Sequence, residues 1–153
     1  MSQLPSSSPL PVVLDTNVVL DMLVFDDPTV RPLVSALTAG AVTAWADEAT
    51  LMELQLVLAY PSFALDEAAQ HAARTRYRDL VRVAPEEPGT PPPPLPRCRD
   101  RDDQKFLTLA ARVGASWLVS KDKRVLALAG HKDVPFDILK PRQLAERLRQ
   151  LER

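Results

Sequence analysis

Four acidic residues stand where strand-like segments of the sequence give way to helix-like ones. Asp15 directly follows the apolar run at residues 12–14, and Asp122 comes just after an apolar segment in the second half of the chain. Glu53 lies in a helix-like segment among apolar neighbours, and Asp103 stands at the start of another such segment. An ionised carboxylate close to an apolar run is costly to desolvate unless something pairs with it, so Asp15 in particular needs a partner.

Each of these acids has an ordinary explanation on its own. An aspartate at the start of a helix accepts hydrogen bonds from free backbone amides and suits the helix dipole, and a glutamate can lie on the polar face of a helix. If the four converge, however, their repulsion cannot persist at neutral pH without protons or a cation, and Mg2+ and Mn2+ prefer oxygen ligands. Such a site can polarise a phosphate oxygen and lower the pKa of a bound water, which is metal-assisted hydrolysis.

The segments that must position these acids alternate between strand-like and helix-like patterns, which predicts a parallel sheet flanked by helices. Strands are expected at residues 12–14, 41–45, 81–84, 116–119 and 136–139. Helices are expected at about residues 17–24, 29–39, 48–58, 67–80, 103–113 and 121–129, and from residue 141 onward. In an open parallel sheet, ligands bind outside the carboxyl ends of the strands, and this rule selects the four acids.

The composition fits one globular domain with no strong electrostatic bias. The chain has 153 residues, of which 46% are hydrophobic and 25% charged, and its 19 basic and 20 acidic residues give a net charge of -1. This balance excludes the strongly basic footprint of a duplex-binding protein. One cysteine, Cys98, and two isolated histidines do not make a disulfide or a Cys/His zinc cluster. With no apolar stretch of membrane-spanning length and no secretory signal pattern, we expect a cytoplasmic protein without a membrane anchor.

The domain organisation is expected to be simple. We predict a single domain over residues 11–153, preceded by a flexible polar tail at residues 1–10. Inside the domain, residues 85–101 are predicted to form a proline-rich loop, because proline lacks an amide donor and fixes its own φ. Two interpretations of this loop stay open: a stiff surface connection between two halves of the domain, or a polyproline ligand for an SH3-type domain.

Four motifs of the sequence resemble those of the PIN-domain metal-dependent ribonucleases, in particular the toxin components of toxin-antitoxin systems. The motifs occur in the order that is usual for this family and with its usual distances between them. They cover about residues 12–141. The motifs are LDTNVVL at residues 14–20, EATLMELQLVL at 48–58, RDRDDQKFLTLA at 99–110 and LVSKDKRVLAL at 118–128. The resemblance implies a PIN-like, single-domain, three-layer α/β/α sandwich with a central, mainly parallel sheet.

The resemblance also implies an activity. It implies an endoribonuclease that cuts single-stranded RNA by a metal-activated water, leaving a 5'-phosphate and a 3'-hydroxyl. One or two Mg2+ or Mn2+ ions would be held, directly or through waters, by Asp15, Glu53, Asp103 and Asp122. Asn17 and Ser120 would hydrogen-bond to these acids and orient them.

Three partners follow from the same resemblance: the RNA substrate, a cognate antitoxin that lays a short segment over the acidic pocket, and a second copy of the chain in a homodimer. A small-residue face for dimer packing is offered by Ala68, Ala69, Ala72 and Ala73, although ordinary core contact explains it equally. Candidate cations for RNA binding, with solvated surface charge as the alternative, are Arg97, Arg99, Arg101, Lys105, Lys121, Lys123 and Arg124.

The sequence departs from the family pattern at two places. Many members carry a further acid two residues after the fourth, where this chain has Arg124, so the number of bound metal ions is open; its planar donors also suit a phosphate. The proline-rich run is not part of the family pattern.

Two other functions compete with the nuclease. A catalytically inactive PIN-like adaptor for RNA or protein is one alternative, which four retained acids argue against. A haloacid-dehalogenase-like phosphatase is the other, but it requires a second acid where this chain has Asn17.

Overall fold

Five short parallel strands form the central sheet of the described chain. The computed structural model describes residues 8–91 and 93–151. The strands follow the order β3-β2-β1-β4-β5, and every neighbouring pair is parallel. Their bounds are β1 (Leu10–Leu14), β2 (Val42–Ala46), β3 (Val81–Val83), β4 (Trp117–Val119) and β5 (Asp137–Leu139).

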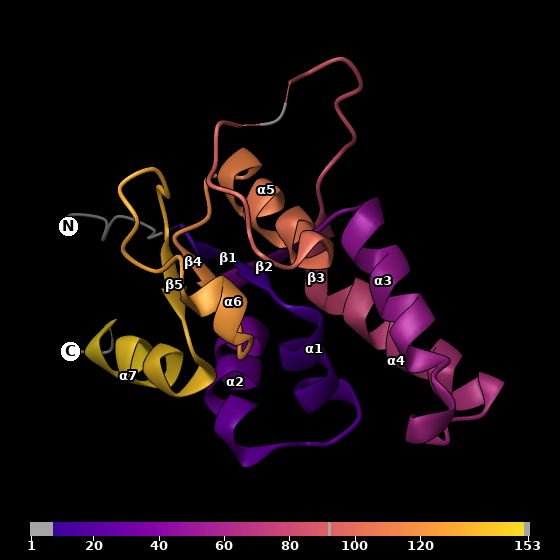
Figure 1. The fold of residues 1–153 in the computed structure, drawn as a ribbon. Coiled ribbons are helices and arrows are strands. Elements are labelled where there is room, and N and C mark those ends of the chain that lie inside the picture. Colours follow the sequence, from indigo (N-terminus) through magenta and orange to yellow (C-terminus); the bar gives the residue numbers. More distant parts are fainter. Residues whose placement is uncertain (1–7, 92, 152–153) are drawn as a thin grey trace.

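Helices cover both faces of this sheet (Figure 1). One apolar core packs α1 (Thr16–Leu23), α2 (Arg31–Ala39), α3 (Glu48–Leu58), α4 (Glu67–Leu80) and α7 (Pro141–Leu151) against one face. A second core packs α5 (Gln104–Arg112) and α6 (Lys123–Leu126) against the other. Along β1, Val12 and Leu14 enter the first core and Val13 the second, as the alternation of side chains along a strand requires. The predicted three-layer α/β/α sandwich is therefore confirmed.

The predicted strands and helices are all present, and their ends follow local chemistry. The side chain of Asp47 accepts the Thr50 amide while the Thr50 hydroxyl accepts the Asp47 amide, a capping box that fixes the start of α3. Gly40 ends α2 in the left-handed region, at φ 79°, which suits a residue without a Cβ. Single turns of 3-10 helix precede or connect the main helices at η1 (Pro28–Val30), η2 (Pro61–Phe63) and η3 (Arg101–Asp103).

The N-terminal boundary differs slightly from the prediction. Of the expected tail at residues 1–10, residues 1–7 lie outside the described residues, and Leu10 already belongs to β1. Leu10 pairs with Val42 of β2, so the strand begins two residues earlier than its apolar run suggests.

The direction in which the sheet is built reverses at β1. The chain leaves β1 to build β2 and β3 on one side, and it returns to build β4 and β5 on the other side. At the carboxyl ends of the neighbouring strands β1 and β4, the Asp15 amide donates to the Val119 carbonyl at 2.9 Å. This reversal of direction is the switch point at which open parallel sheets bind ligands.

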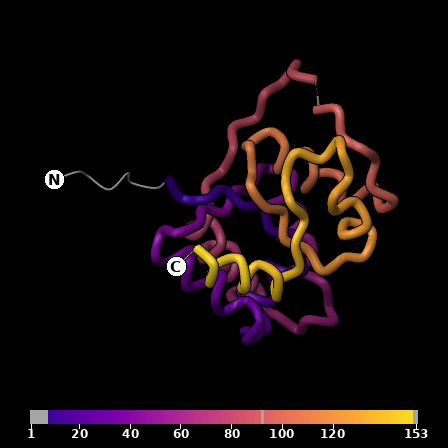
Figure 2. The backbone as a smooth tube through the Cα atoms, turned by 90° about the vertical axis from the view of Figure 1, so that its left-hand side faces the viewer, coloured from indigo at the N-terminus to yellow at the C-terminus, as the bar shows by residue number. Residues whose placement is uncertain are grey.

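The proline-rich segment connects β3 to η3 without forming a helix or strand in residues 85–91 and 93–98. Figure 2 shows it extending outward from the body of the domain. Its far end is tied down, because Gln104 accepts the Cys98 amide at 2.6 Å and donates to the Pro96 carbonyl at 3.3 Å. These two bonds hold the segment that carries the acids of η3. In the described part of the chain, no helix has the length and apolar character needed to cross a membrane.

Candidate functional site

Asp15 lies at the start of α1, directly after β1, and only 3% of it is exposed. One carboxylate oxygen accepts the Asn17 amide at 3.0 Å, and the other accepts the Ser120 hydroxyl at 2.6 Å. Burial raises the pKa of Asp15, the two hydrogen bonds lower it, and the nearby carboxylates of Glu53 and Asp122 raise it further. Asp15 is thus paired with neutral donors, and no ion pair involves it in the described residues.

Ser120 joins two of the predicted acids across the ends of β1 and β4. Its side chain is fully buried, donates to Asp15, and accepts the Asp122 amide at 3.0 Å. Its own amide donates to the Leu139 carbonyl, which fixes its position at the sheet edge. The backbone of Asn17 also contributes a hydrogen bond, but its side chain is exposed and lines an open hollow beside Asp122.

Two further carboxylates, those of Asp100 and Asp103, meet Asp122 next to Asp15. One carboxylate oxygen from each of Asp100, Asp103 and Asp122 lies within 4.8 Å of the others. Asp103 is buried, and its Oδ2 atom has no hydrogen-bond partner in residues 8–91 and 93–151. Burial, together with the charges of Asp15, Asp122 and Asp100, raises the pKa of Asp103 to about 7. We refer to Asp15, Asp100, Asp103 and Asp122 as the acidic corner.

The donor set of the acidic corner fits a divalent cation. It consists of carboxylate oxygens, which hard cations such as Mg2+ prefer, and among the described residues the buried Oδ2 atom of Asp103 has no hydrogen-bond partner. Burial and then the neighbouring carboxylates raise the pKa of Asp103, and a cation there would bond to its oxygen and offset both effects.

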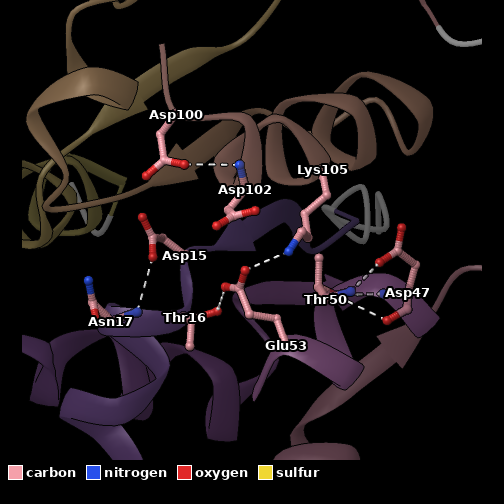
Figure 3. Close-up of polar contacts among 9 residues, drawn as sticks. All are labelled: Asp15, Thr16, Asn17, Asp47, Thr50, Glu53, Asp100, Asp102 and Lys105. Carbon is pink, nitrogen blue, oxygen red and sulfur yellow. Dashed lines mark hydrogen bonds and ion pairs between the residues drawn. The ribbon is translucent and has the colours of Figure 1, made fainter. Parts of the chain in front are cut away.

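Glu53 lies on the other side of Asp15 and has a different environment. Its carboxylate, with 19% of the side chain exposed, accepts the Thr16 hydroxyl and pairs with the Lys105 ammonium, both at 2.5 Å. Figure 3 shows these two contacts, with Asp15 and Asp100 turned toward the same region. Glu53 is close enough to raise the pKa of Asp15, but a cation within the chain already balances its charge.

The structure therefore places three of the four predicted acids in the acidic corner and the fourth, Glu53, beside it. Asp15, Asp103 and Asp122 belong to the acidic corner, and Glu53 borders it through Asp15. Their roles as metal ligands stay a prediction. Sequence reasoning missed Asp100, whose signal is its spacing of three residues from Asp103 within the third motif; in that motif only Asp103 was predicted as a ligand.

The cations expected to contact RNA fall into two groups. Three of them form ion pairs: Lys105 with Glu53, Lys121 with Asp21 at 2.6 Å, and Arg124 with Asp100 at 2.9 Å. The others are exposed and form no ion pair in the part of the chain that the structure describes; they are Arg97, Arg99, Arg101 and Lys123.

The small-residue face of α4 is mostly accessible. Ala68, Ala69 and Ala72 are exposed, whereas Ala73 packs into the core. Ordinary core contact therefore accounts for Ala73 alone.

Comparison with known proteins supports the resemblance. The family model described as "PIN domain" matches residues 11–124. The crystal structure of PAE2754 from Pyrobaculum aerophilum is similar to this chain, with a TM-score of 0.57 and 15% sequence identity over 97% of each chain. At this identity the likeness shows the fold alone. No curated protein sequence matches the chain.

Proposed function

Because this chain belongs to the PIN-domain family, whose members are in general nucleases, we propose that it is a metal-dependent endoribonuclease that hydrolyses single-stranded RNA. The observation that carries this proposal is the acidic corner, where acids from three separate segments meet and the buried Oδ2 atom of Asp103 has no hydrogen-bond partner within the described residues. A structural role leaves such repulsion unbalanced, whereas a cation site explains it.

The acids of the corner would hold Mg2+ or Mn2+, with Asp15, Asp103 and Asp122 as the main ligands and Asp100 as an added one. When bound, such an ion polarises a phosphate oxygen and lowers the pKa of a water molecule. Ser120 holds Asp15 in one orientation through its 2.6 Å hydrogen bond and anchors the backbone of Asp122. Glu53 becomes a fifth ligand on this proposal only if its carboxylate turns from Lys105 toward the acidic corner.

A cation at the rim of the acidic corner, Arg124, would attract the phosphates of the substrate. Arg124 pairs with Asp100 and keeps 58% of its side chain exposed, so it offers free guanidinium donors to a phosphate at the rim. Attack of the water on phosphorus, with cleavage of the bond from phosphorus to the 3'-oxygen and protonation of that oxygen, would leave a 5'-phosphate and a 3'-hydroxyl on the products.

The biological role that fits best is the toxin of a type II toxin-antitoxin system, acting on RNA in the cytoplasm. The four motifs support this role, and the open hollow lined by Asn17, Asp122 and Arg124 gives an antitoxin segment access to the acids. A homodimer would use the exposed Ala68, Ala69 and Ala72 of α4. A neighbouring gene for a small DNA-binding protein is the expected genomic context, and its absence would contradict the toxin role.

The activity is tested with purified protein and an unstructured RNA labelled at one end. We expect cleavage with Mg2+ or Mn2+, none with EDTA, and products that carry a 5'-phosphate. Cleavage that survives EDTA would overturn the metal mechanism. Binding of RNA without cleavage in any divalent metal would instead favour the inactive adaptor, for which the Glu53–Lys105 pair is the supporting observation.

A further inference from the structure

Helix α4 presents a basic face to the groove between α3 and α4. His71, Arg74 and Arg78 follow a spacing of three and four residues, which places them on one face of the helix. They line a cavity of about 280 Å³ together with Met52 and Gln55 of α3. The two helices pack against each other, as Figure 1 shows.

The groove extends toward the start of α4. A second hollow there is lined by Gln70 and again by His71 and Arg74. One carboxylate lies at the wall of each hollow, Glu48 in the first and Glu67 in the second. The two hollows share His71 and Arg74, and we refer to them together as the groove.

The two arginines of this groove are not neutralised within the described chain. No ion pair there involves Arg74 or Arg78, in contrast to Lys105, Lys121 and Arg124 beside the acids. Two guanidinium groups on the wall of a groove create a positive potential that attracts anions, and their planar donors match phosphate oxygens.

Helix α3 separates this groove from the acidic corner. Met52 lines the groove, whereas the next residue, Glu53, lies on a different flank of the helix, about 100° around its axis, where it contacts Thr16 and Lys105. The surface between the two flanks is apolar and open, because Met52 is 53% and Leu56 is 60% exposed. A helix with its side chains is about 10 Å wide, so a strand that crosses α3 connects the two sites over that distance.

We infer that the groove between α3 and α4 binds the phosphate backbone of single-stranded RNA to one side of the cleaved bond. Arg74 and Arg78 contact phosphates, and the bases on the way to the acids lie over Met52 and Leu56. Contacts of this kind are independent of base sequence and add affinity through release of counterions. The choice of RNA as ligand rests on the proposed function, whereas the groove and its charge do not.

The test compares charge removal inside and outside the groove. Binding of a fluorescent oligouridylate of about ten nucleotides, a length typical of single-strand binding sites, is measured by anisotropy in EDTA at several salt concentrations. The variant Arg74→Gln/Arg78→Gln is compared with Arg76→Gln, since Arg76 is an exposed arginine of the same helix that does not line the groove. A lysine variant, Arg74→Lys/Arg78→Lys, checks that charge and not helix integrity is responsible.

The expected results follow from counting phosphates. The double glutamine variant should bind roughly tenfold more weakly, and the slope of log K against log salt should fall by about 1.4, at about 0.7 for each phosphate on a single strand. Arg76→Gln and the double lysine variant should keep the wild-type slope. A dinucleotide too short to cross α3 should be cleaved equally by all variants.

Two outcomes would overturn the inference that the groove binds RNA. One is wild-type protein that fails to bind the oligonucleotide, and the other is equal affinity and salt slope for the groove variant and Arg76→Gln. A protein contact at this face, in place of RNA, would give the second result. If the chain binds RNA through the groove yet cleaves none with Mn2+, the proposed function fails and the groove stands.

Discussion

Two acids on opposite sides of Asp15 are stabilised in opposite ways. Glu53 has a cation and a hydroxyl donor, Lys105 and Thr16, that belong to the chain itself. Asp103 has other carboxylates as neighbours and a buried oxygen without a partner in the described residues, and its pKa rises to about 7. The same chemical group is balanced on one side and unbalanced on the other.

This difference indicates which carboxylates would bind an external cation most favourably. At Asp103 and Asp122, which form no ion pair in the described residues, a divalent ion replaces repulsion with attraction. At Glu53 it must first displace Lys105. We therefore expect metal affinity to originate in the acidic corner and Glu53 to contribute little to it. The following predictions test this asymmetry.

The largest effect is expected from Asp15→Asn, because Asp15 lies between the two sides. The rate of RNA cleavage in Mn2+ should fall by about a thousandfold or more. In the variant the amide oxygen can still accept the Asn17 amide, while the amide nitrogen can donate to the Ser120 hydroxyl oxygen where Ser120 now donates to Asp15. The metal-free melting temperature should therefore stay near the wild-type value, because the reversed hydrogen bond accompanies removal of a buried charge. Cleavage near the wild-type rate in this variant would exclude Asp15 from the chemistry.

The second prediction compares the two sides directly through metal-induced stability. Saturating Mn2+ should raise the melting temperature of the wild-type chain by about 5–10 °C, since a ligand at a hundred times its Kd adds about 2.7 kcal/mol. Asp103→Asn should lose most of this rise, and Glu53→Gln should keep most of it. Asp102→Asn, at an exposed neighbouring carboxylate, is the matched control and should behave as wild type. An equal loss in Asp103→Asn and Glu53→Gln would contradict the asymmetry.

Most of the fold was predictable because its signals are local. The apolar run before Asp15 and the capping residue Asp47 each mark one end of an element, and β1 and α3 begin or end there as expected. The pairing of Leu10 with Val42 was not predictable, since register at a strand end depends on the neighbouring strand and not on its own pattern.

The candidate site was predictable only in part. Strand ends pointed to Asp15 and Asp122, because the position of a strand end can be read from the sequence. The roles of Asp100 and Lys105 could not be read in the same way. Whether an acid faces another acid, or a lysine faces a glutamate 52 residues away, is decided by the packing of α5 against the sheet.

A third prediction concerns the pH dependence of metal-free stability. In the folded chain Asp103 binds its proton more tightly than in the unfolded chain, with a pKa of about 7 against 3.8. The free energy of unfolding in EDTA should therefore fall as pH rises between these values and level off above pH 7. The slope is at most about 1.4 kcal/mol per pH unit, less where water reaches the carboxylate. Urea titrations should show a flatter profile for Asp103→Asn, and a wild-type stability that rises through this window would contradict the repulsion in the acidic corner.

The smallest effect is expected from Lys105→Met, and it is the one that decides whether Glu53 can join the acidic corner. Removing the cation leaves Glu53 with the Thr16 hydroxyl alone, so metal-free stability should fall by about 1 kcal/mol, as expected for a partly buried pair. If the freed carboxylate then turns toward a metal in the corner, Mn2+ should raise the melting temperature of this variant more than that of wild type. Lys123→Met, at an exposed lysine with no ion pair in the described chain, is the control. An unchanged Mn2+ response in Lys105→Met would show that Glu53 serves to hold α3 and α5 together and that the acidic corner binds its cation without it.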